Sequence, residues 1–316
     1  MTPTLTTHDL FEAQSAPLKL QWVAGRGGKD RLLEPTTARF PGMALVGHLN
    51  FVHPNRVQVI GGAEIAYLNR LSPEERAKAL ADLFACPTSA LVIVANDEPV
   101  APDLISASER TQLPLLASAM PSPRLIDDLQ YYLTRALAPR ETAHGVFMEV
   151  LSLGVFITGD AGIGKSELAL ELLSRGHRLI ADDAVEFSRI APDALEGHCP
   201  EMLCDFLEVR GLGILNVRAM FGETAVRRKK ELHLIVRLED FKSAAHIDRL
   251  AADQRTRRML GIDVPEVLLF VAPGRNLAVL VETASRNHIL KLRGINPLQE
   301  LVDKQNAAMN ADTRNR

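Results

Sequence analysis

Eight residues near the middle of the chain form a complete phosphate-binding loop. They follow the pattern G-x-x-x-x-G-K-[ST], whose glycines let backbone N–H groups approach a polyphosphate closely. A helix that starts in such a loop adds the positive end of its dipole. Lys165 can reach the β- and γ-phosphate oxygens, and the Ser166 hydroxyl can bind Mg²⁺. The candidate nucleotide ligands are Gly159, Asp160, Ala161, Gly162, Ile163, Gly164, Lys165 and Ser166.

The segments on both sides of this loop have the character that such a loop requires. Residues 155–158 are β-branched and aromatic, which is typical of a strand, and residues 167–173 are strong helix formers with an apolar stripe. Residues 146–150 also favour a strand and are separated from 153–158 by a short turn at Ser152. The sequence therefore predicts an antiparallel hairpin that leads into the loop and then into a helix.

Phosphoryl transfer also requires a base and further charge near the phosphate. Asp182 and Asp183 are carboxylates in the otherwise apolar segment 178–187, which we predict to be a strand. Because side chains alternate along a strand, only one of the two should face the phosphate. That carboxylate could accept the proton of an acceptor hydroxyl, although a turn or cap carboxylate is the alternative.

Three other features have weaker patterns. In residues 208–217 charged side chains precede two glycines, which a β-turn explains as well as close approach to a ligand. Residues 273–276 are typical of a turn, and Arg275 within them could engage phosphate. His144 stands alone ahead of a strand, so composition by itself favours a packing role for it.

The chain around these residues predicts two α/β domains. At 316 residues it is long for a single core. Leucines recur every four residues in 125–138 and predict an amphipathic helix that Pro139 ends, our candidate for the interdomain linker. We predict a small α/β domain over 1–138, a phosphate-binding-loop domain over 139–310 and a frayed tail over 311–316.

Within the first domain, helical and strand-like segments alternate. Capping and periodicity predict helices, whereas short apolar runs predict buried strands. The expected helices begin at Thr7 and span 73–80, and the expected strands span 56–61, 90–95 and 113–118. A further short helix is expected over 297–303, near the end of the second domain.

Composition excludes several classes of protein. The formal net charge of −3 does not indicate a general nucleic-acid binder. No apolar run approaches the roughly 20 residues that span a bilayer, and the N-terminus does not have the pattern of a signal peptide. The odd number of cysteines, three, favours a reducing cytoplasm over a disulfide framework. His198, Cys199 and Cys204 could be read as zinc ligands. The sequence has no second Cys/His pair at the spacing of a zinc site, so a zinc site is not expected.

Taken together, the motifs resemble those of the HPr kinase/phosphorylase family along most of the chain. Residues 39–47 extend the resemblance into the N-terminal part. Six blocks that recur in the family in this order are 144–146, 159–167, 175–183, 207–214, 248–250 and 273–279.

The resemblance implies an ATP- and Mg²⁺-dependent serine kinase of HPr, the phosphocarrier of the sugar phosphotransferase system. It also implies the reverse activity, in which inorganic phosphate removes the phosphoryl group and pyrophosphate forms. The implied fold has a catalytic core similar to that of phosphoenolpyruvate carboxykinase, and the implied assembly is a homohexamer, with no membrane or nucleic-acid partner.

The resemblance also carries residue roles, position by position. The base that takes the serine proton, and returns it in the reverse reaction, corresponds to Asp183. Residues 207–216 match a segment needed by both activities, and 270–275 match one needed for dephosphorylation. The implied catalytic residues are His144, Lys165, Asp183 and Arg249, and the implied Mg²⁺ ligands are Ser166 and Glu208.

Two positions depart from the family pattern. Ala161 stands where the family commonly has Ser, and Ala272 stands where it commonly has Arg. Loss of the arginine removes a potential phosphate contact, so we expect the kinase activity to be retained and the phosphorylase activity to be the one affected. The alternatives are a small-molecule kinase and a nucleotide-binding regulator without turnover. A mere binding module has no need of residues such as Asp183 and Glu208.

Overall fold

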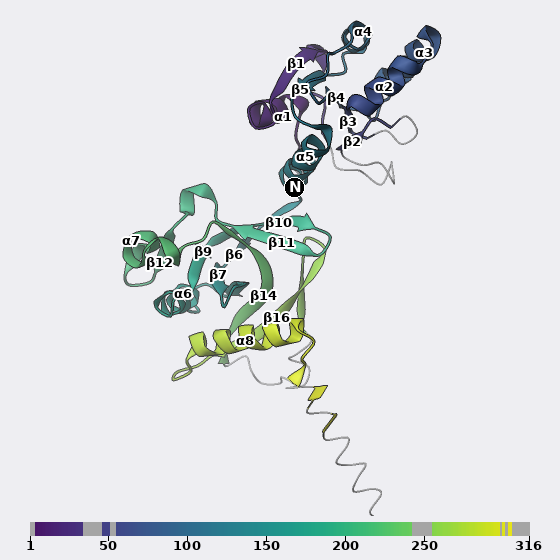
Figure 1. The fold of residues 1–316 in the computed structure, drawn as a ribbon. Helices are drawn as coiled ribbons and strands as arrows, with labels where there is room; N and C mark the ends of the chain where they lie inside the picture. The colour runs from purple at the N-terminus through teal and green to yellow at the C-terminus, as the bar shows by residue number, and fades with distance from the viewer. Residues whose placement is uncertain are drawn as a thin grey trace, which may run out of the picture. The chain divides into compact units, whose positions relative to one another are not determined.

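The computed structural model describes residues 4–33, 46–50, 55–241, 255–297, 299–300 and 303–304. Its chain divides into two compact units, Met1–Pro139 and Arg140–Arg316 (Figure 1). Both units combine helices with a β-sheet, in agreement with the α/β class predicted from the sequence. Within the described residues, no helix is long and apolar enough to cross a membrane.

The N-terminal unit is built on a five-stranded sheet in the order β1-β5-β4-β3-β2. Strands β2 to β5 are parallel to their neighbours, whereas β1 is antiparallel to β5. The strands are β1 (Leu20–Ala24), β2 (Val46–His48), β3 (Val57–Ile60), β4 (Leu91–Val94) and β5 (Leu115–Ser118). The helices are α1 (Thr7–Gln14), η1 (Arg26–Gly28), α2 (Gly62–Arg70), α3 (Pro73–Ala85), α4 (Pro102–Thr111) and α5 (Ser122–Ala136).

Helices cover both faces of this sheet, which explains the apolar strands. In β4, Leu91 and Ile93 pack in one core with leucines of α1 and α5, and Val92 and Val94 pack in a second core with α2, α3 and α4. The leucines of α5 are fully buried in the first core. This helix is therefore part of the N-terminal unit and not a free connecting segment.

The expected elements of this unit are present. The helix that begins at Thr7 has a capping box formed by Thr6 and Asp9, and the helix predicted over 73–80 extends to Ala85. The three predicted strands correspond to β3, β4 and β5. The segment 297–303 lies partly outside the described residues, and the tail 311–316 lies wholly outside them.

An ion pair joins helices α3 and α4, and we predict that its contribution to the free energy of unfolding depends on pH. Arg76 Nε and Nη2 lie 2.5 and 3.1 Å from the two carboxylate oxygens of Asp103. The guanidinium holds the pKa of Asp103 below its ordinary value of 3.8. Because the folded pKa is lowered, the pair stabilises the fold above the unfolded pKa, and this contribution is lost as the pH falls through the folded pKa.

We expect Asp103→Asn to lower the unfolding free energy of this unit by about 0.5–1 kcal/mol at pH 7, a value reduced by the partial exposure of the pair. The difference from wild type should shrink towards zero below pH 3.8. Urea unfolding followed by the fluorescence of Trp22, the single tryptophan, measures this unit. Asp82→Asn, exposed on α3, is the control. A difference that persists undiminished at acidic pH would contradict the ion-pair explanation.

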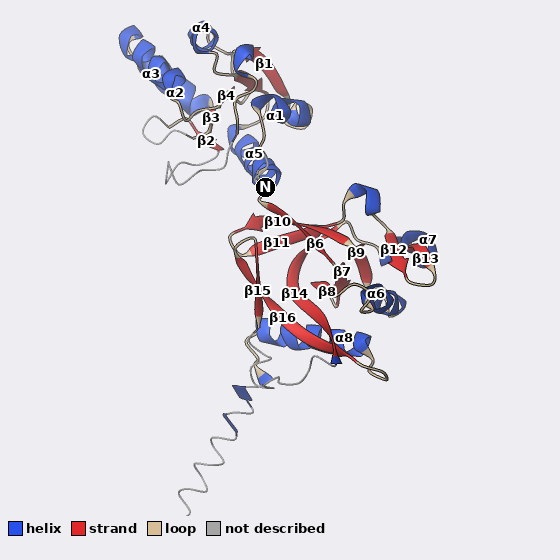
Figure 2. Cartoon of the chain, turned by 180° about the vertical axis from the view of Figure 1, so that it is seen from behind, coloured by secondary structure: helices blue, strands red, loops and turns tan. Residues whose placement is uncertain are grey.

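The C-terminal unit contains a nine-stranded sheet that curls on itself (Figure 2). The order β6-β10-β11-β14-β8-β7-β9 is extended by β16 on β14 and by β15 on β16. Its strands are β6 (Arg140–His144), β7 (Val146–Val150), β8 (Leu153–Gly159), β9 (Arg178–Ala181), β10 (Ala184–Ala191), β11 (Ala194–His198), β14 (Lys229–Asp240), β15 (Thr256–Met259) and β16 (Ile262–Val271). The remaining elements are α6 (Lys165–Ser174), η2 (Glu201–Leu203), the hairpin β12 (Phe206–Val209) and β13 (Gly213–Asn216), α7 (Val217–Phe221), η3 (Glu223–Ala225) and α8 (Leu277–Leu292).

The centre of this sheet is parallel and buried on both faces. Strand β14 runs parallel to both β8 and β16. One face packs against α6 and α8 through residues such as Leu168, Leu172 and Val281. On the other face, the ring of Phe187 makes edge-to-face contacts with Phe147 and Phe156, at 5.4 and 5.1 Å between centroids. The end of β8, from which the phosphate-binding loop leaves, is thus held rigidly.

Two local predictions in this unit have different outcomes. The hairpin before the loop is confirmed, because β7 and β8 are antiparallel and Leu151 and Ser152 form the turn with positive φ. The single strand predicted over 178–187 is wrong. Asp182 and Asp183 separate β9, which pairs with β7, from β10, which pairs with β6 and β11. The change of partner requires a bend that an uninterrupted apolar pattern does not reveal.

Candidate functional site

The phosphate-binding loop joins the end of β8 to the start of α6. Gly159 has a φ of +146°, and a Cβ atom there would lie 2.5 Å from the carbonyl oxygen of Leu238 on β14. Gly164, the residue before the helix, has a φ of +103°. Both positions therefore need glycine. Lys165 Nζ donates hydrogen bonds of 2.9 Å to the carbonyl oxygens of Gly159 and Asp160, which places the ammonium group over its own loop.

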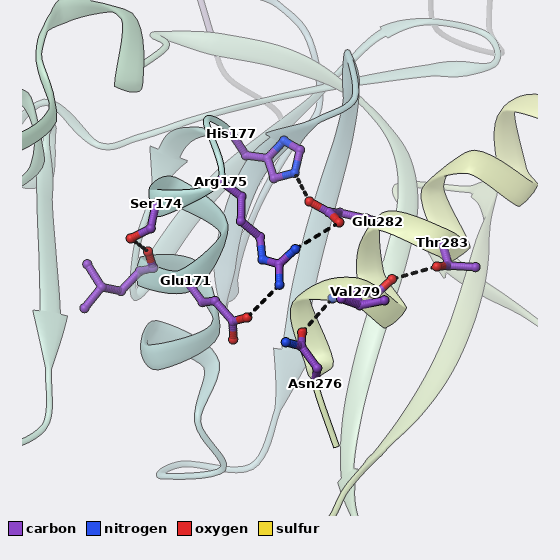
Figure 3. Close-up of polar contacts among 9 residues, drawn as sticks. Glu171, Ser174, Arg175, His177, Asn276, Val279, Glu282 and Thr283 are labelled. Atoms are coloured by element: carbon purple, nitrogen blue, oxygen red, sulfur yellow. Dashed lines mark hydrogen bonds and ion pairs between the residues drawn. The ribbon is translucent and has the colours of Figure 1, made fainter. Parts of the chain in front are cut away.

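The far end of α6 is tied to α8 by a polar network (Figure 3). The buried His177 ring places Nε2 3.0 Å from Oε1 of Glu282, and Arg175 bridges Glu282 and Glu171 at 3.4 and 3.2 Å. Gly176 ends the helix with a φ of +88°, as its sequence position predicts. The helix that begins with Lys165 and Ser166 is consequently anchored to α8 at its C-terminal end.

A cavity of about 680 Å³ lies at the mouth of the loop. It brings together three segments that are distant in the sequence, around His144, Asp183 and Glu208, with the loop itself. Its lining comprises His144, Gly145, Gly159, Ala161, Gly162, Gly164, Lys165, Ser166, Glu167, Asp182, Asp183, Glu208, Val209, Arg210, Gly211 and Gly213.

Asp183 and His144 face each other in this cavity. Asp183 adopts a left-handed φ of +64°, and its carbonyl oxygen accepts a hydrogen bond of 3.1 Å from the Gly145 N–H. His144 Nδ1 lies 3.8 Å from Asp183 Oδ1, and the His144 side chain is 83% exposed. The packing role that composition favoured for His144 is therefore wrong. The register of β6 against β10, which pairs His144 with Ala184, brings the two side chains together.

Asp182 lies deeper in the same cavity and receives two hydrogen bonds. Ser166 Oγ donates to its Oδ1 at 3.4 Å, and the Glu208 N–H donates to its Oδ2 at 2.9 Å. Burial raises the pKa of Asp182, which these hydrogen bonds only partly offset. Both aspartates line the cavity, and the expectation that only one of them faces the phosphate stays a prediction. The left-handed backbone at Asp183 breaks the alternation of side chains on which that expectation depended.

The β12–β13 hairpin supplies Glu208 and Arg210. The Arg210 guanidinium approaches the phosphate-binding loop, since both of its terminal nitrogens lie 3.3 Å from the position that a Cβ atom would take on Gly162. The sequence motifs give this arginine no individual role. The sequence feature that could have indicated it is a positive charge next to the two glycines of residues 208–217. Its position at the phosphate-binding loop follows only from the fold.

The residues present fit a magnesium ion. Ser166, Asp182 and Glu208 offer hydroxyl and carboxylate oxygens, the hard ligands that Mg²⁺ prefers. No group of three His, Cys, Asp or Glu side chains with metal-binding geometry occurs in the part of the chain that the structure describes. Mg²⁺ commonly uses one or two protein oxygens together with substrate phosphates and water, so a complete protein cage is not required.

Comparison with known proteins gives matches over the whole chain. Residues 5–133 match the family model described as HPr Serine kinase N terminus, and residues 135–305 match the HPr Serine kinase C-terminal domain. An HPr kinase/phosphorylase of Chromobacterium violaceum is 52% identical over 96% of this chain and 95% of its own length. An HPr kinase/phosphorylase of Neisseria gonorrhoeae is 50% identical over 99% of this chain and 98% of its own length. The chain belongs to the HPr kinase/phosphorylase family.

A solved structure of similar sequence is that of the Hpr(Ser) kinase/phosphatase from Coxiella burnetii. It is 41% identical and covers 49% of this chain and 93% of its own, with a TM-score of 0.46. The two family models together cover both units of the present chain.

Some positions implied by the family resemblance lie away from the cavity or outside the described residues. Arg249 and most of the block 39–47 fall outside the described residues. Arg275 does not line the described part of the cavity, and its Nη1 donates to the Phe270 carbonyl oxygen at 3.2 Å. The similarity of the core to phosphoenolpyruvate carboxykinase stays a prediction.

Proposed function

We propose that the chain transfers the γ-phosphoryl group of ATP to a serine of HPr and, with inorganic phosphate, removes it again to give pyrophosphate. The observation that carries this proposal is the single cavity that holds the phosphate-binding loop, Asp183 and Glu208. The names of the relatives, HPr kinase/phosphorylase, support the same substrate and the same pair of activities.

In the kinase direction, Asp183 accepts the proton of the serine hydroxyl as the serine oxygen bonds to the γ-phosphorus and the bond to the leaving ADP oxygen breaks. In the reverse direction, phosphate oxygen attacks the phosphoserine phosphorus, and Asp183 returns the proton to the departing serine oxygen. One carboxylate serves both reactions because each exchanges a proton with the same serine oxygen. Its exposed position beside His144 is consistent with access for a protein substrate.

The remaining groups of the cavity bind and orient phosphate. The loop amides and Lys165 hold the β- and γ-phosphate oxygens, and we assign to Arg210 the neutralisation of charge on the transferred group. Ser166, Asp182 and Glu208 would hold Mg²⁺, which when bound supplies further charge neutralisation at the phosphate oxygens. Arg249 is retained as a proposed catalytic residue from the resemblance.

The organisation around this activity is also proposed. We assign catalysis to residues 139–310 and a structural or regulatory role to 1–138. A homohexamer is the assembly that the family resemblance implies, and sedimentation measures it directly. The three free cysteines agree with a protein that works in a reducing cytoplasm.

The test is transfer from radiolabelled Mg-ATP to purified HPr, followed by a chase with inorganic phosphate. We expect the serine to be labelled, and removal of the label with release of pyrophosphate would establish the reverse activity. Label that resists the chase would identify a kinase only, with Ala272 as the first position to replace by Arg. ATP binding without any labelling of HPr would overturn the proposal and favour a small-molecule kinase or a nucleotide-binding regulator.

A further inference from the structure

Three large apolar side chains are exposed on the hairpin that borders the cavity. Phe206, Leu212 and Ile214 are 43%, 65% and 72% exposed, and we call these three residues the apolar rim. Single exposed apolar residues are common on protein surfaces, but a group of them beside a site is typical of an interaction surface. The group lies within nine residues of chain, on either side of Glu208 and Arg210.

The register of the hairpin places Phe206 and Ile214 on the same face as Glu208, and Leu212 lies in the turn between the two strands. Ile214 is directly opposite Glu208, and side chains of directly opposed residues lie on one face with Cβ atoms about 4.5–5.5 Å apart. Phe206, two residues before Glu208 on β12, also shares this face. Leu207 and Val209 point the other way into the core. The apolar rim therefore adjoins a carboxylate that lines the cavity.

The hairpin is held firmly while it exposes these side chains. Arg218 of α7 makes two contacts with the Asp205 carboxylate, at 2.8 and 3.2 Å, and the Val217 N–H donates to the Asp205 carbonyl oxygen at 2.9 Å. The hairpin lies beside α6, the helix that begins at Lys165, through contacts of β12 (Figure 2). The rim is thus a fixed surface next to the phosphate-binding loop.

We propose that the apolar rim docks the protein substrate, through an apolar surface next to the serine that is phosphorylated. This inference rests on the proposed function. A cavity of about 680 Å³ can hold phosphates and a serine side chain but not a folded protein. A folded protein that presents its serine to Asp183 must therefore cover the mouth of the cavity and approach the hairpin that borders it and carries the rim. The small extent of the rim suits a transient substrate complex better than a permanent subunit interface.

The test compares Phe206→Ser and Phe206→Ala with wild type in the transfer assay with HPr, because Phe206 is the rim residue outside the segment 207–216. Each variant should raise the KM for HPr about tenfold, because burial of a well-placed apolar side chain contributes at this level in interfaces. The kcat at saturating HPr and the affinity for Mg-ATP should stay within twofold. Since HPr and phosphoseryl-HPr share the docking surface, the KM of the reverse reaction should rise by a similar factor.

Leu292→Ser is the matched control, because Leu292 is 63% exposed at the end of α8 and does not line the described part of the cavity. It should leave the KM unchanged. If wild type fails to label HPr, the proposed function itself fails. If wild type labels HPr but the rim variants keep its KM, only the docking surface is overturned. A fall in kcat at constant KM, or a smaller mass on sedimentation, would also overturn it, in favour of support for Glu208 or of contact between copies of the chain.

Discussion

Asp183→Asn should lower phosphoryl transfer to HPr about 10³-fold, within the range that a positioned general base contributes, and leave Mg-ATP affinity within twofold of wild type. The amide cannot accept the serine proton. The substitution preserves size, and asparagine tolerates the left-handed φ of +64° that this position requires. The backbone contact between the Asp183 carbonyl oxygen and the Gly145 N–H also remains available. Initial rates of HPr labelling measure the phosphoryl transfer, and calorimetric titration with Mg-ATP measures the affinity for the nucleotide.

Asp97→Asn is a suitable control for this variant. Asp97 also has a left-handed φ, +57°, and lies in the N-terminal unit, so the same chemical change is made in a similar backbone conformation. Its transfer rate should equal that of wild type. If Asp183→Asn weakens nucleotide binding as much as it slows transfer, Asp183 organises the nucleotide pocket. If it retains a tenth of the activity or more, another group acts as the base.

The phosphate-binding loop was predictable because its requirements are local. The glycines, the apolar strand before them and the helix former after them are contiguous, and each follows from backbone conformation or from the approach to a phosphate. The structure adds the reason why Gly159 cannot be replaced, which is the carbonyl oxygen of Leu238 on a neighbouring strand. That contact joins residues about eighty positions apart and is not encoded in any local pattern.

The same distinction explains the errors at the cavity. The residues around Asp182 and Asp183 are apolar on both sides, and a continuous strand is the natural local interpretation. The bend at Asp183 arises because the chain leaves β7 and joins β6 and β11, which depends on the topology of the whole sheet. His144 was similarly uninformative by itself, since its proximity to Asp183 comes from the pairing of β6 with β10.

Arg210 shows a third kind of limit. From the sequence, a turn explains the glycine-rich segment 208–217 as well as close approach to a ligand does. The hairpin does contain such a turn, with Gly211 and Gly213 both at a φ of +85°. Only the folded structure shows that the hairpin places Arg210 close to the phosphate-binding loop and Glu208 next to Asp182. The conformational explanation of these glycines is confirmed, and their close approach to a ligand stays a prediction.

Lys165→Met should weaken the binding of Mg-ATP about 100-fold, which corresponds to about 2.7 kcal/mol, a value typical of a lost charged hydrogen bond to phosphate. In the structure the ammonium group donates to the carbonyl oxygens of Gly159 and Asp160, so it is already held over the loop. Binding of phosphate therefore requires only a short movement of Nζ and little loss of side-chain freedom. Methionine keeps the length of the side chain but neither the charge nor the donors.

Thermal unfolding with and without Mg-ATP provides a measurement that does not depend on turnover. At a ligand concentration of about 100 times the wild-type Kd, bound nucleotide should stabilise wild type by about 2.7 kcal/mol and the variant by less than about 0.5 kcal/mol. Lys229→Met is the matched control, because Lys229 pairs with Glu196 at 3.2 Å and does not line the described part of the cavity. Equal stabilisation of Lys165→Met and wild type would show that nucleotide binds elsewhere. The contacts between α6 and α8 do not involve Lys165, so the free variant should unfold at the same temperature as free wild type. If only the stabilisation by Mg-ATP is lost, Lys165 binds phosphate and is not needed for the integrity of the loop.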